Sequence, residues 1–237
     1  MNILTKTKNI LLDILFPPIC LNCGFDLKGK EKRDKICEKC LDSIITYSSF
    51  FCPKCKSRIP GEEKTCHKDV KYLLAPATNY KNDSVKNIVK FIKYNRWTSL
   101  LNTVEPILEK YLSLLKYNFE NFIIIPIPLH KDRERERGFN QSELIAKILC
   151  KKTGASININ ALKRIRFTKT QAELKDPEER MKNVKDCFAL IDPNEVKNKN
   201  IILVDDVFTT GSTINEAVKN LKQAGAKKII AFVFAKA

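Results

Sequence analysis

The sequence contains no long hydrophobic segment. Its longest apolar runs, such as Ile123–Ile125 and Ile229–Phe234, are far shorter than the roughly 20 residues that a membrane-spanning helix needs. The segment Met1–Cys20 is rich in leucine and isoleucine, but Asp13 interrupts it and no small-residue cleavage site follows, which argues against a secretory signal. We therefore expect a cytoplasmic protein, with peripheral contact at the inner face of the membrane as the only membrane role.

Two common nucleotide-binding signatures are also absent. There is no GK[ST] ending that would mark a Walker loop, and no GxGxxG that would mark a dinucleotide fingerprint. Histidine is scarce as well, because His67 and His130 are the only two. His130 invites a role as an acid or base, because histidine titrates near neutral pH.

Positive charge dominates the composition. The chain has 43 lysines and arginines against 27 aspartates and glutamates, which gives a formal net charge of +16. Such a charge favours polyanionic partners: nucleic acid, phosphorylated metabolites or an anionic membrane surface. The basic residues are spread along the whole chain, however, and zinc-bound thiolates would lower the total. Charge therefore permits nucleic-acid binding without establishing it.

Residues 1–17 carry apolar side chains at helical spacing. Ile3, Ile10, Leu11, Ile14 and Leu15 fall on one face of a helix. The spacing predicts an amphipathic helix, which either packs on its own protein or lies on a membrane surface.

Seven of the nine cysteines fall between residues 20 and 66, and six of them form three CxxC pairs. In the first two pairs, Cys20/Cys23 and Cys37/Cys40, each two-residue gap lets a tight turn present both sulfurs to a tetrahedral metal. Two such knuckles make a closed four-sulfur zinc ribbon. Structural disulfides or redox pairs are the alternatives, and a reducing cytosol and the lack of a strand–helix context disfavour them.

A second structural zinc site is expected on Cys52, Cys55 and Cys66, with His67 as a candidate fourth ligand. Adjacent ligands such as Cys66 and His67 diverge on an extended backbone, so one of the two need not bind. The segment Phe16–Val70 has few large apolar residues, and metal binding would supply its folding free energy. Its lysines, Lys54 and Lys56 among them, are candidates for contact with nucleic acid or a partner protein.

From Tyr72 onward, strand-like and helix-like patterns alternate. This alternation predicts parallel strand pairing and a doubly wound α/β sheet. The region between Pro126 and Asn140 reads as a charged loop. Strands are expected at Tyr72–Tyr80, Phe122–Pro126, Asn200–Asp205 and Lys228–Phe234, and helices at Ser84–Tyr94, Thr98–Leu115, Asn140–Lys152 and Thr213–Ala224.

The segment Ile201–Thr213 joins an apolar strand to two acids and a cluster of hydroxyl residues. Ligands of open α/β sheets bind at the carboxyl ends of strands, where Asp205 and Asp206 are expected. Carboxylates there can accept hydrogen bonds from ribose hydroxyls. Backbone N–H groups and hydroxyls at the following helix N-terminus can converge on a phosphate. The phosphate-binding residues would be Thr209, Thr210, Gly211, Ser212 and Thr213.

A plainer interpretation of the same segment is a capping box made by Thr213 and Glu216. A capping box explains neither the paired aspartates nor the four hydroxyls gathered around Gly211. A metal site on the two aspartates alone would lack further ligands nearby.

The order of apolar strand, two acids and TTGST resembles the phosphoribosyl pyrophosphate (PRPP) motif of type I phosphoribosyltransferases. Two further segments narrow the resemblance to the ComF family. The run PIPLHKDRERERGFNQ, from Pro126 to Gln141, resembles its signature with the RGFNQ ending, and Thr170–Phe188 resembles the segment that precedes the loop strand. The opening LLDILFPPIC and the CxxC series fit as well. Family members often carry a fourth CxxC, of which only Cys66 remains here.

The resemblance implies a zinc-ribbon module followed by a parallel-sheet, Rossmann-like phosphoribosyltransferase domain. With the cysteine distribution, it divides the chain into an N-terminal helix (1–17), a zinc-ribbon module (18–70) and a phosphoribosyltransferase-like domain (71–237). It also implies that Asp205 and Asp206 bind the ribose hydroxyls of PRPP and that Thr209–Thr213 bind its 5′-phosphate. Mg²⁺ bound with PRPP would neutralise the departing pyrophosphate.

By the same resemblance, the turn after Pro126–Pro128 would bind pyrophosphate. The candidate residues there are Leu129, His130, Lys131, Arg133 and Arg137. Arg133, Arg135 and Arg137 alternate with acids, which equally fits a self-paired solvated loop. For Lys93 we favour a solvated helix position, with a phosphate contact as the alternative. No catalytic residue is assigned, because phosphoribosyl transfer runs mostly on positioning and charge stabilisation.

Three functions are consistent with these features. The first is a ComF-type factor that helps single-stranded DNA enter the cell during natural competence, together with other DNA-uptake proteins. The second is an active phosphoribosyltransferase acting on a nucleobase or another nucleophile. The third is a non-catalytic scaffold that keeps PRPP binding as a sensor. The first two are compatible, and fold analogy alone does not decide among the three.

Overall fold

The structure is a computed structural model that describes residues 17–60, 66–94, 101–168 and 176–237. The amphipathic helix expected over residues 1–17 lies almost wholly outside the described residues, as does part of the segment Thr170–Phe188. Within the described part of the chain, no helix is both long enough and apolar enough to cross a membrane.

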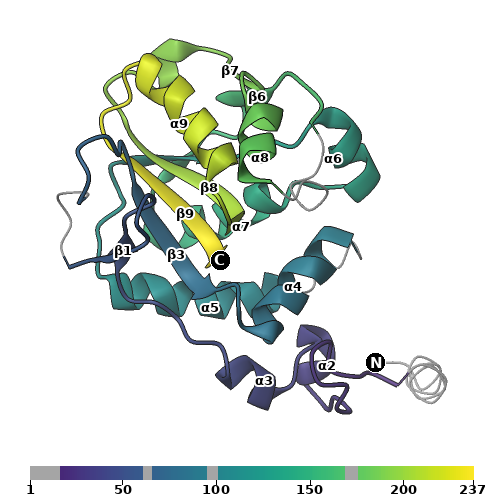
Figure 1. The fold of residues 1–237 in the computed structure, drawn as a ribbon. Helices are drawn as coiled ribbons and strands as arrows, with labels where there is room; N and C mark the ends of the chain where they lie inside the picture. Colours follow the sequence, from purple (N-terminus) through teal and green to yellow (C-terminus); the bar gives the residue numbers. More distant parts are fainter. Residues whose placement is uncertain (1–16, 61–65, 95–100, 169–175) are drawn as a thin grey trace.

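A seven-stranded sheet forms the centre of the molecule (Figure 1). Its strand order is β2-β1-β3-β9-β8-β4-β5, and β3, β9, β8, β4 and β5 run parallel. The predicted α/β class with parallel pairing is therefore confirmed. The strand bounds are β1 Phe50–Phe51, β2 Arg58–Ile59, β3 Leu73–Asn79, β4 Phe122–Pro126, β5 Ser156–Ile157, β8 Asn200–Phe208 and β9 Ile229–Lys236.

The central strands β8 and β9 are apolar on both faces because helices cover the sheet on both sides. One face packs against α4 (Asp83–Tyr94), α5 (Leu101–Leu115) and α7 (Gln141–Thr153). The other packs against α8 (Pro177–Val184) and α9 (Ser212–Gln223). The aromatic pair Tyr111–Phe232 marks the first of these interfaces, with ring centroids 5.5 Å apart.

A second, two-stranded sheet lies on the α8 side of the molecule. It pairs β6 (Leu162–Arg164) with β7 (Phe188–Leu190) in antiparallel fashion. A single 3-10 turn, η2 (Pro193–Glu195), then leads into β8. Sequence periodicity did not predict β1, β2, β5, β6, β7 or α8, because segments of two to eight residues show too few repeats of either period.

The prediction of a charged loop between Pro126 and Asn140 is wrong, because Lys131–Arg137 form a helix, α6. His130 caps it: its Nδ1 accepts a hydrogen bond from the backbone N–H of Asp132 at 3.4 Å. The helix ends at Gly138, whose φ of 82° is left-handed. Acids in the first turn and arginines in the last also suit the helix dipole, so the alternating charges support a helix here.

The cysteine-rich segment is joined to the main sheet. Phe51 of β1 pairs with Leu74 of β3, so β1 and β2 extend the sheet at its β3 edge. The earlier part of the segment carries the short helices α2 (Glu31–Asp34) and α3 (Glu38–Asp42) and contacts α4 and α5. There the Asn87 amide donates to Asn22 at 3.0 Å, and the Thr103 hydroxyl donates to the carbonyl of Asp34 at 2.9 Å.

Phe232 provides a test of the central packing. It is 1% exposed on β9, so Phe232→Ala leaves a cavity between the sheet and α5. The expected loss in the free energy of unfolding is about 3–5 kcal/mol, measured by urea denaturation. Ile191→Ala, at a side chain 62% exposed, is the control and should change stability by no more than about 0.5 kcal/mol. Equal effects of the two changes would contradict this description of the core.

Candidate functional site

Two adjacent carboxylates, those of Asp205 and Asp206, lie in β8, three and two residues before its last residue. Asp205 Oδ1 accepts hydrogen bonds from the Ser142 hydroxyl at 3.1 Å and from the backbone N–H of Asp206 at 2.9 Å. Asp206 Oδ2 forms an ion pair with Lys93 Nζ at 2.8 Å and accepts from the Gln141 amide at 3.3 Å. Both acids are thus held by donors from α4 and α7.

Burial and the neighbouring charge of Asp206 together raise the pKa of Asp205 to about 7, against an ordinary 3.8. The backbone N–H of Asp206, the charge of Lys93 and the Ser142 hydroxyl oppose this rise in pKa. For Lys93, burial alone would lower the pKa, but the carboxylates of Asp206 and Asp205 raise it. The solvated position expected for Lys93 is therefore wrong, because its side chain is only 25% exposed and is paired with Asp206.

The start of α7 connects the paired acids to the end of β4. Asn140 caps α7 by accepting from the Ser142 N–H at 3.0 Å, and its amide donates to the carbonyl of Ile127 at 2.9 Å. Gln141 and Ser142 then reach the aspartates. Asn140 and Gln141 belong to the RGFNQ motif, but these roles were not predicted from the sequence.

The loop Thr209–Gly211 joins β8 to α9. Gly211 occupies the N-cap position of α9 with a left-handed φ of 79°. A Cβ atom there would lie 2.7 Å from the Phe208 ring, so the loop requires glycine on both counts. The Thr210 hydroxyl lies 2.8 Å from the Ser212 hydroxyl. Four of the five predicted loop residues, all except Thr210, line one small pocket together with Asp205. The lining residues are Asp205, Val207, Phe208, Thr209, Gly211, Ser212, Thr213 and Ile214.

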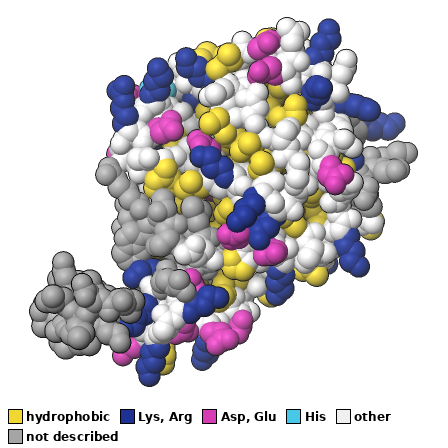
Figure 2. All heavy atoms as spheres, turned by 180° about the vertical axis from the view of Figure 1, so that it is seen from behind, with side chains coloured by type: hydrophobic (Ala, Val, Ile, Leu, Met, Phe, Trp, Pro, Cys, Tyr) yellow, Lys and Arg dark blue, Asp and Glu magenta, His cyan; other side chains and the backbone are white. Residues whose placement is uncertain are grey.

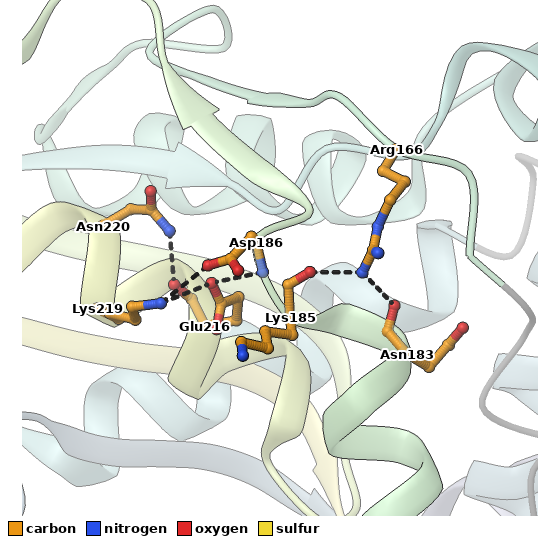
Figure 3. Close-up of polar contacts among 7 residues, drawn as sticks. All are labelled: Arg166, Asn183, Lys185, Asp186, Glu216, Lys219 and Asn220. Carbon is orange, nitrogen blue, oxygen red and sulfur yellow. Dashed lines mark hydrogen bonds and ion pairs between the residues drawn. The ribbon is translucent and has the colours of Figure 1, made fainter.

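The capping-box alternative is wrong. Gly211 is the N-cap of α9, so Thr213 is already inside the helix. Glu216 instead accepts the backbone N–H of Asp186 at 3.0 Å and pairs with Lys219 at 3.5 Å (Figure 3). Lys219 also pairs with Asp186 at 3.0 Å, so α9 is fastened to the connection between α8 and β7.

On that connection, the Arg166 guanidinium donates to the backbone carbonyls of Asn183 and Lys185 (Figure 3). This contact holds the segment after β6 against the end of α8. The small sheet, α8 and the first turns of α9 therefore form one hydrogen-bonded unit on this side of the loop.

The turn predicted to bind pyrophosphate lies at the same edge of the sheet as the loop, because the N–H of Ile127 donates to the carbonyl of Val204 at 2.8 Å. Leu129 and His130 are half-buried there, and Lys131 is exposed at the start of α6. The charge of Arg137 is close enough to Lys93 to oppose its protonation. The structure thus brings the turn, the loop and the aspartates together.

The other two arginines of α6 differ from each other. The Arg133 guanidinium donates to the Thr168 carbonyl and lies 5.1 Å from the centroid of the Phe167 ring. It therefore connects α6 to the segment after β6. Arg135 is 81% exposed, and Asp132 at 4.0 Å is its ion-pair partner, as the self-paired alternative predicted.

The first four cysteines gather around one point. The ligand atoms of Cys20, Cys23, Cys37 and Cys40 all lie within 4.8 Å of one another. The Cys23 and Cys37 sulfurs are 3.7 Å apart, close to the sulfur–sulfur separation of about 3.8 Å that Zn–S bonds of about 2.3 Å give in a tetrahedron. The Cys37 N–H also points at the Cys20 sulfur, at 3.4 Å. This donor set fits structural zinc.

The second cluster contains Cys52, Cys55, Cys66 and His67. His67 Nδ1 lies 3.5 Å from the Cys52 sulfur and 3.2 Å from the Cys66 sulfur. Cys66 and His67 therefore converge, whereas an extended backbone would separate them. The set is three sulfurs and one nitrogen, a closed combination that structural zinc sites use.

Comparisons with known proteins agree with both halves of this description. The double zinc ribbon domain family matches residues 11–70, and the phosphoribosyl transferase domain family matches residues 142–237. The DNA utilization protein YhgH of Salmonella typhimurium is 37% identical over 210 residues, which cover 87% of this chain and 86% of YhgH. The chain belongs to the family of ComF and YhgH proteins. Competence protein ComFC of Bacillus subtilis is 27% identical over 202 residues, covering 81% of this chain and 80% of ComFC.

Among solved structures, the chain resembles the glutamine PRPP amidotransferase of B. subtilis, with 17% identity and a TM-score of 0.36 over 65% of this chain and 28% of that one. The ComF/YhgH membership and the two ligand clusters together support structural zinc. The match to the phosphoribosyl transferase domain family identifies the domain that contains Asp205, Asp206 and the Thr209–Gly211 loop as phosphoribosyltransferase-like.

The metal clusters give one prediction. Cys23 and Cys55 are exposed members of different clusters. Cys23→Ser and Cys55→Ser should therefore each remove one of two bound zinc ions per chain, as measured by elemental analysis of the purified protein. Cys150→Ser, outside both clusters, is the control and should leave the zinc content unchanged. Unchanged zinc content in Cys23→Ser or Cys55→Ser would contradict the assignment of that cluster.

The raised pKa of Asp205 gives a prediction about how stability depends on pH. Between pH 3.8 and about 7 the folded chain holds a proton at Asp205 that the unfolded chain has lost. The free energy of unfolding should therefore fall as pH rises through this range. In Asp205→Asn this contribution disappears, so the stability of the variant relative to wild type should increase with pH. Urea denaturation at several pH values measures the difference, and a difference that is constant with pH would refute the shift.

Proposed function

We propose that this chain binds PRPP with Mg²⁺ at the edge of the sheet where β4 and β8 end, and acts as a ComF-type factor in the uptake of single-stranded DNA. The observation that carries the PRPP assignment is the pair Asp205–Asp206 beside a glycine-dependent loop at a helix N-terminus. Paired carboxylates and a loop of N–H and hydroxyl donors are complementary to a sugar phosphate.

Each part of the site has a role in this proposal. Asp205 and Asp206 accept hydrogen bonds from the ribose hydroxyls, and residues Thr209–Thr213 surround the 5′-phosphate. Leu129, His130 and Lys131, with Arg133 and Arg137 on α6, face the pyrophosphate. Mg²⁺ supplies charge neutralisation on the pyrophosphate oxygens when it arrives with PRPP.

Lys93, Gln141 and Ser142 position the two acids. Their donors hold both carboxylates in place before any ligand binds, so little reorganisation is needed on binding. His130 is engaged as the cap of α6, which suits a turn-forming role better than that of a base. The proposal therefore assigns no general base.

The part of the proposal that concerns DNA uptake, called the DNA arm, is supported by the names of the relatives, competence protein and DNA utilization protein. The net charge of +16 suits a polyanion, although bound thiolates reduce it. A cytoplasmic location belongs to the same proposal, because two clusters with seven thiols call for a reducing compartment. Other DNA-uptake proteins would be partners in this role.

An active phosphoribosyltransferase is the second candidate function. It is favoured by the phosphate loop and the match to the phosphoribosyl transferase domain family. Pyrophosphate release in the presence of a nucleobase would support it. A scaffold that only senses PRPP would bind PRPP and release no pyrophosphate.

Calorimetric titration of the zinc-loaded protein with PRPP and Mg²⁺ tests the PRPP site. We expect binding by wild type and a loss of at least about 100-fold in Asp205→Asn/Asp206→Asn, because two charge-assisted hydrogen-bond acceptors are worth about 1.5–3 kcal/mol each. Asp192→Asn is the control, since Asp192 only caps the 3-10 turn and asparagine caps equally well. Absence of binding by wild type, or equal binding by the double variant, would overturn the assignment.

A further inference from the structure

A groove lies between α9 and the knuckle formed by Cys52 and Cys55 of the second cysteine cluster. Its volume is about 600 Å³, within the range of clefts that bind ligands. Thr210 of the phosphate loop contributes to its lining, so the groove adjoins the proposed PRPP site. The lining residues are Pro53, Lys54, Asp69, Val70, Lys71, Tyr72, Thr210, Asn215, Val218, Lys219, Lys222 and Gln223.

The charges on these walls are unbalanced. Four lysines line the groove, but Asp69 is the single acid among the lining residues. Asp69 pairs with Lys54 at 2.8 Å, and Lys219 pairs with Asp186 and Glu216 outside the groove. In the described part of the chain, Lys71 and Lys222 have no acidic partner within ion-pair distance. The groove therefore keeps a net positive charge.

Lys222 is partly buried, and its ammonium group donates to the carbonyls of Ala226 at 3.0 Å and Lys227 at 2.7 Å. Burial lowers its pKa, and the charge of Lys71 lowers it further. The two ammonium groups thus repel each other across the groove wall. An anion placed between them would relieve this repulsion.

The apolar part of the lining is equally relevant. Pro53, Val70, Tyr72 and Val218 line the groove together with the lysines. The Tyr72 ring is fixed, because its hydroxyl donates to the Asn215 amide oxygen at 2.7 Å. The groove can therefore hold charged phosphates and apolar base faces side by side, a combination that proteins use for single strands.

Cations also gather on the other side of the same knuckle. Lys236 lies over the Phe51 ring, with its Nζ 4.4 Å from the centroid. Burial lowers the pKa of Lys236, and the charges of Lys56, Arg58 and Lys81 lower it further. By contrast, the described atoms on the face seen in Figure 2 show lysines and arginines interspersed with acids. Several cations of the described residues thus lie close enough to this knuckle to interact with one another.

We propose that this groove is the path of a single-stranded nucleic acid, with its phosphates held by Lys54, Lys71 and Lys222. The proposal rests on the DNA arm of the proposed function and gives it a location. A hollow of this kind suits a flexible strand with unstacked bases, whereas a stiff, convex duplex would touch only the rims. A strand in the groove passes Thr210 and so runs beside the bound PRPP.

The test uses the full-length, zinc-loaded protein and a fluorescent oligothymidylate of about 15 nucleotides, a length within the site sizes of single-strand binding folds. Fluorescence anisotropy is recorded from low to moderate salt for wild type and Lys71→Gln/Lys222→Gln. Each phosphate contact contributes about 0.7 to the slope of log K against log salt, so the double variant should lose about 1.4 of slope and about tenfold or more in affinity.

Two further variants make this result specific. Lys71→Gln alone should lose about half of that slope, and it leaves the carbonyl contacts of Lys222 intact. Lys110→Gln/Lys151→Gln removes the same charge from exposed positions on α5 and α7, across the sheet from α9. This control should match wild type.

Three results would overturn the proposal. If Lys71→Gln/Lys222→Gln binds like wild type, the groove is not the path, although the DNA arm stands. If wild type does not bind the oligonucleotide even at low salt, the DNA arm fails too, and PRPP calorimetry on the same samples shows whether the PRPP arm survives. If polyglutamate of similar length binds as tightly and is lost in the same variants, the groove binds an acidic protein segment.

Discussion

The repulsion between two adjacent carboxylates in a central strand organises this part of the molecule. Asp205 and Asp206 are largely removed from water in β8, where neither charge is stable without donors. A half-buried lysine from α4 and two polar side chains from the start of α7 supply these donors. Ion pairing and hydrogen bonding to the two aspartates therefore position α4 and α7 on one face of the sheet, in addition to apolar packing.

The need for hydrogen-bond donors to the aspartates also explains why the RGFNQ segment has two consecutive amide side chains, Asn140 and Gln141, in a buried environment. Asn140 and Gln141 are 7% and 5% exposed, although amides are normally found at the surface. The Asn140 side chain caps α7 and donates to the Ile127 carbonyl, and the Gln141 amide donates to Asp206, so hydrogen bonds compensate the burial of both side chains. Burial of polar groups is here the consequence of holding two acids in place.

Much of the fold follows from sequence periodicity, because apolar spacing is a local property. Phe122–Pro126 was predicted at its observed bounds, and the long helices were predicted to within a few residues. α6 was missed because its charges have no apolar stripe, and its stability comes from the His130 cap and the helix dipole. Cys66 and His67 were expected to diverge, and only the folded loop shows that they converge.

The site was predictable in part for the same reason. The acids, the loop and the turn each carry a local motif, and the structure brings them to one edge of the sheet. The Lys93–Asp206 pair joins residues more than a hundred positions apart, and a helix lysine looks the same in sequence whether it is solvated or paired. Long-range pairing of this kind has no signature in a single sequence.

The position of β9 in the sheet has a consequence for how the protein is made. β9 is the last of the described strands in chain order, yet it lies between β3 and β8 near the middle of the sheet. During translation, β3 and β8 have no common partner until the ribosome has released residues 229–236. The growing chain must therefore keep two apolar strand edges apart until β9 has emerged, and during this interval the unpaired edges are open to aggregation.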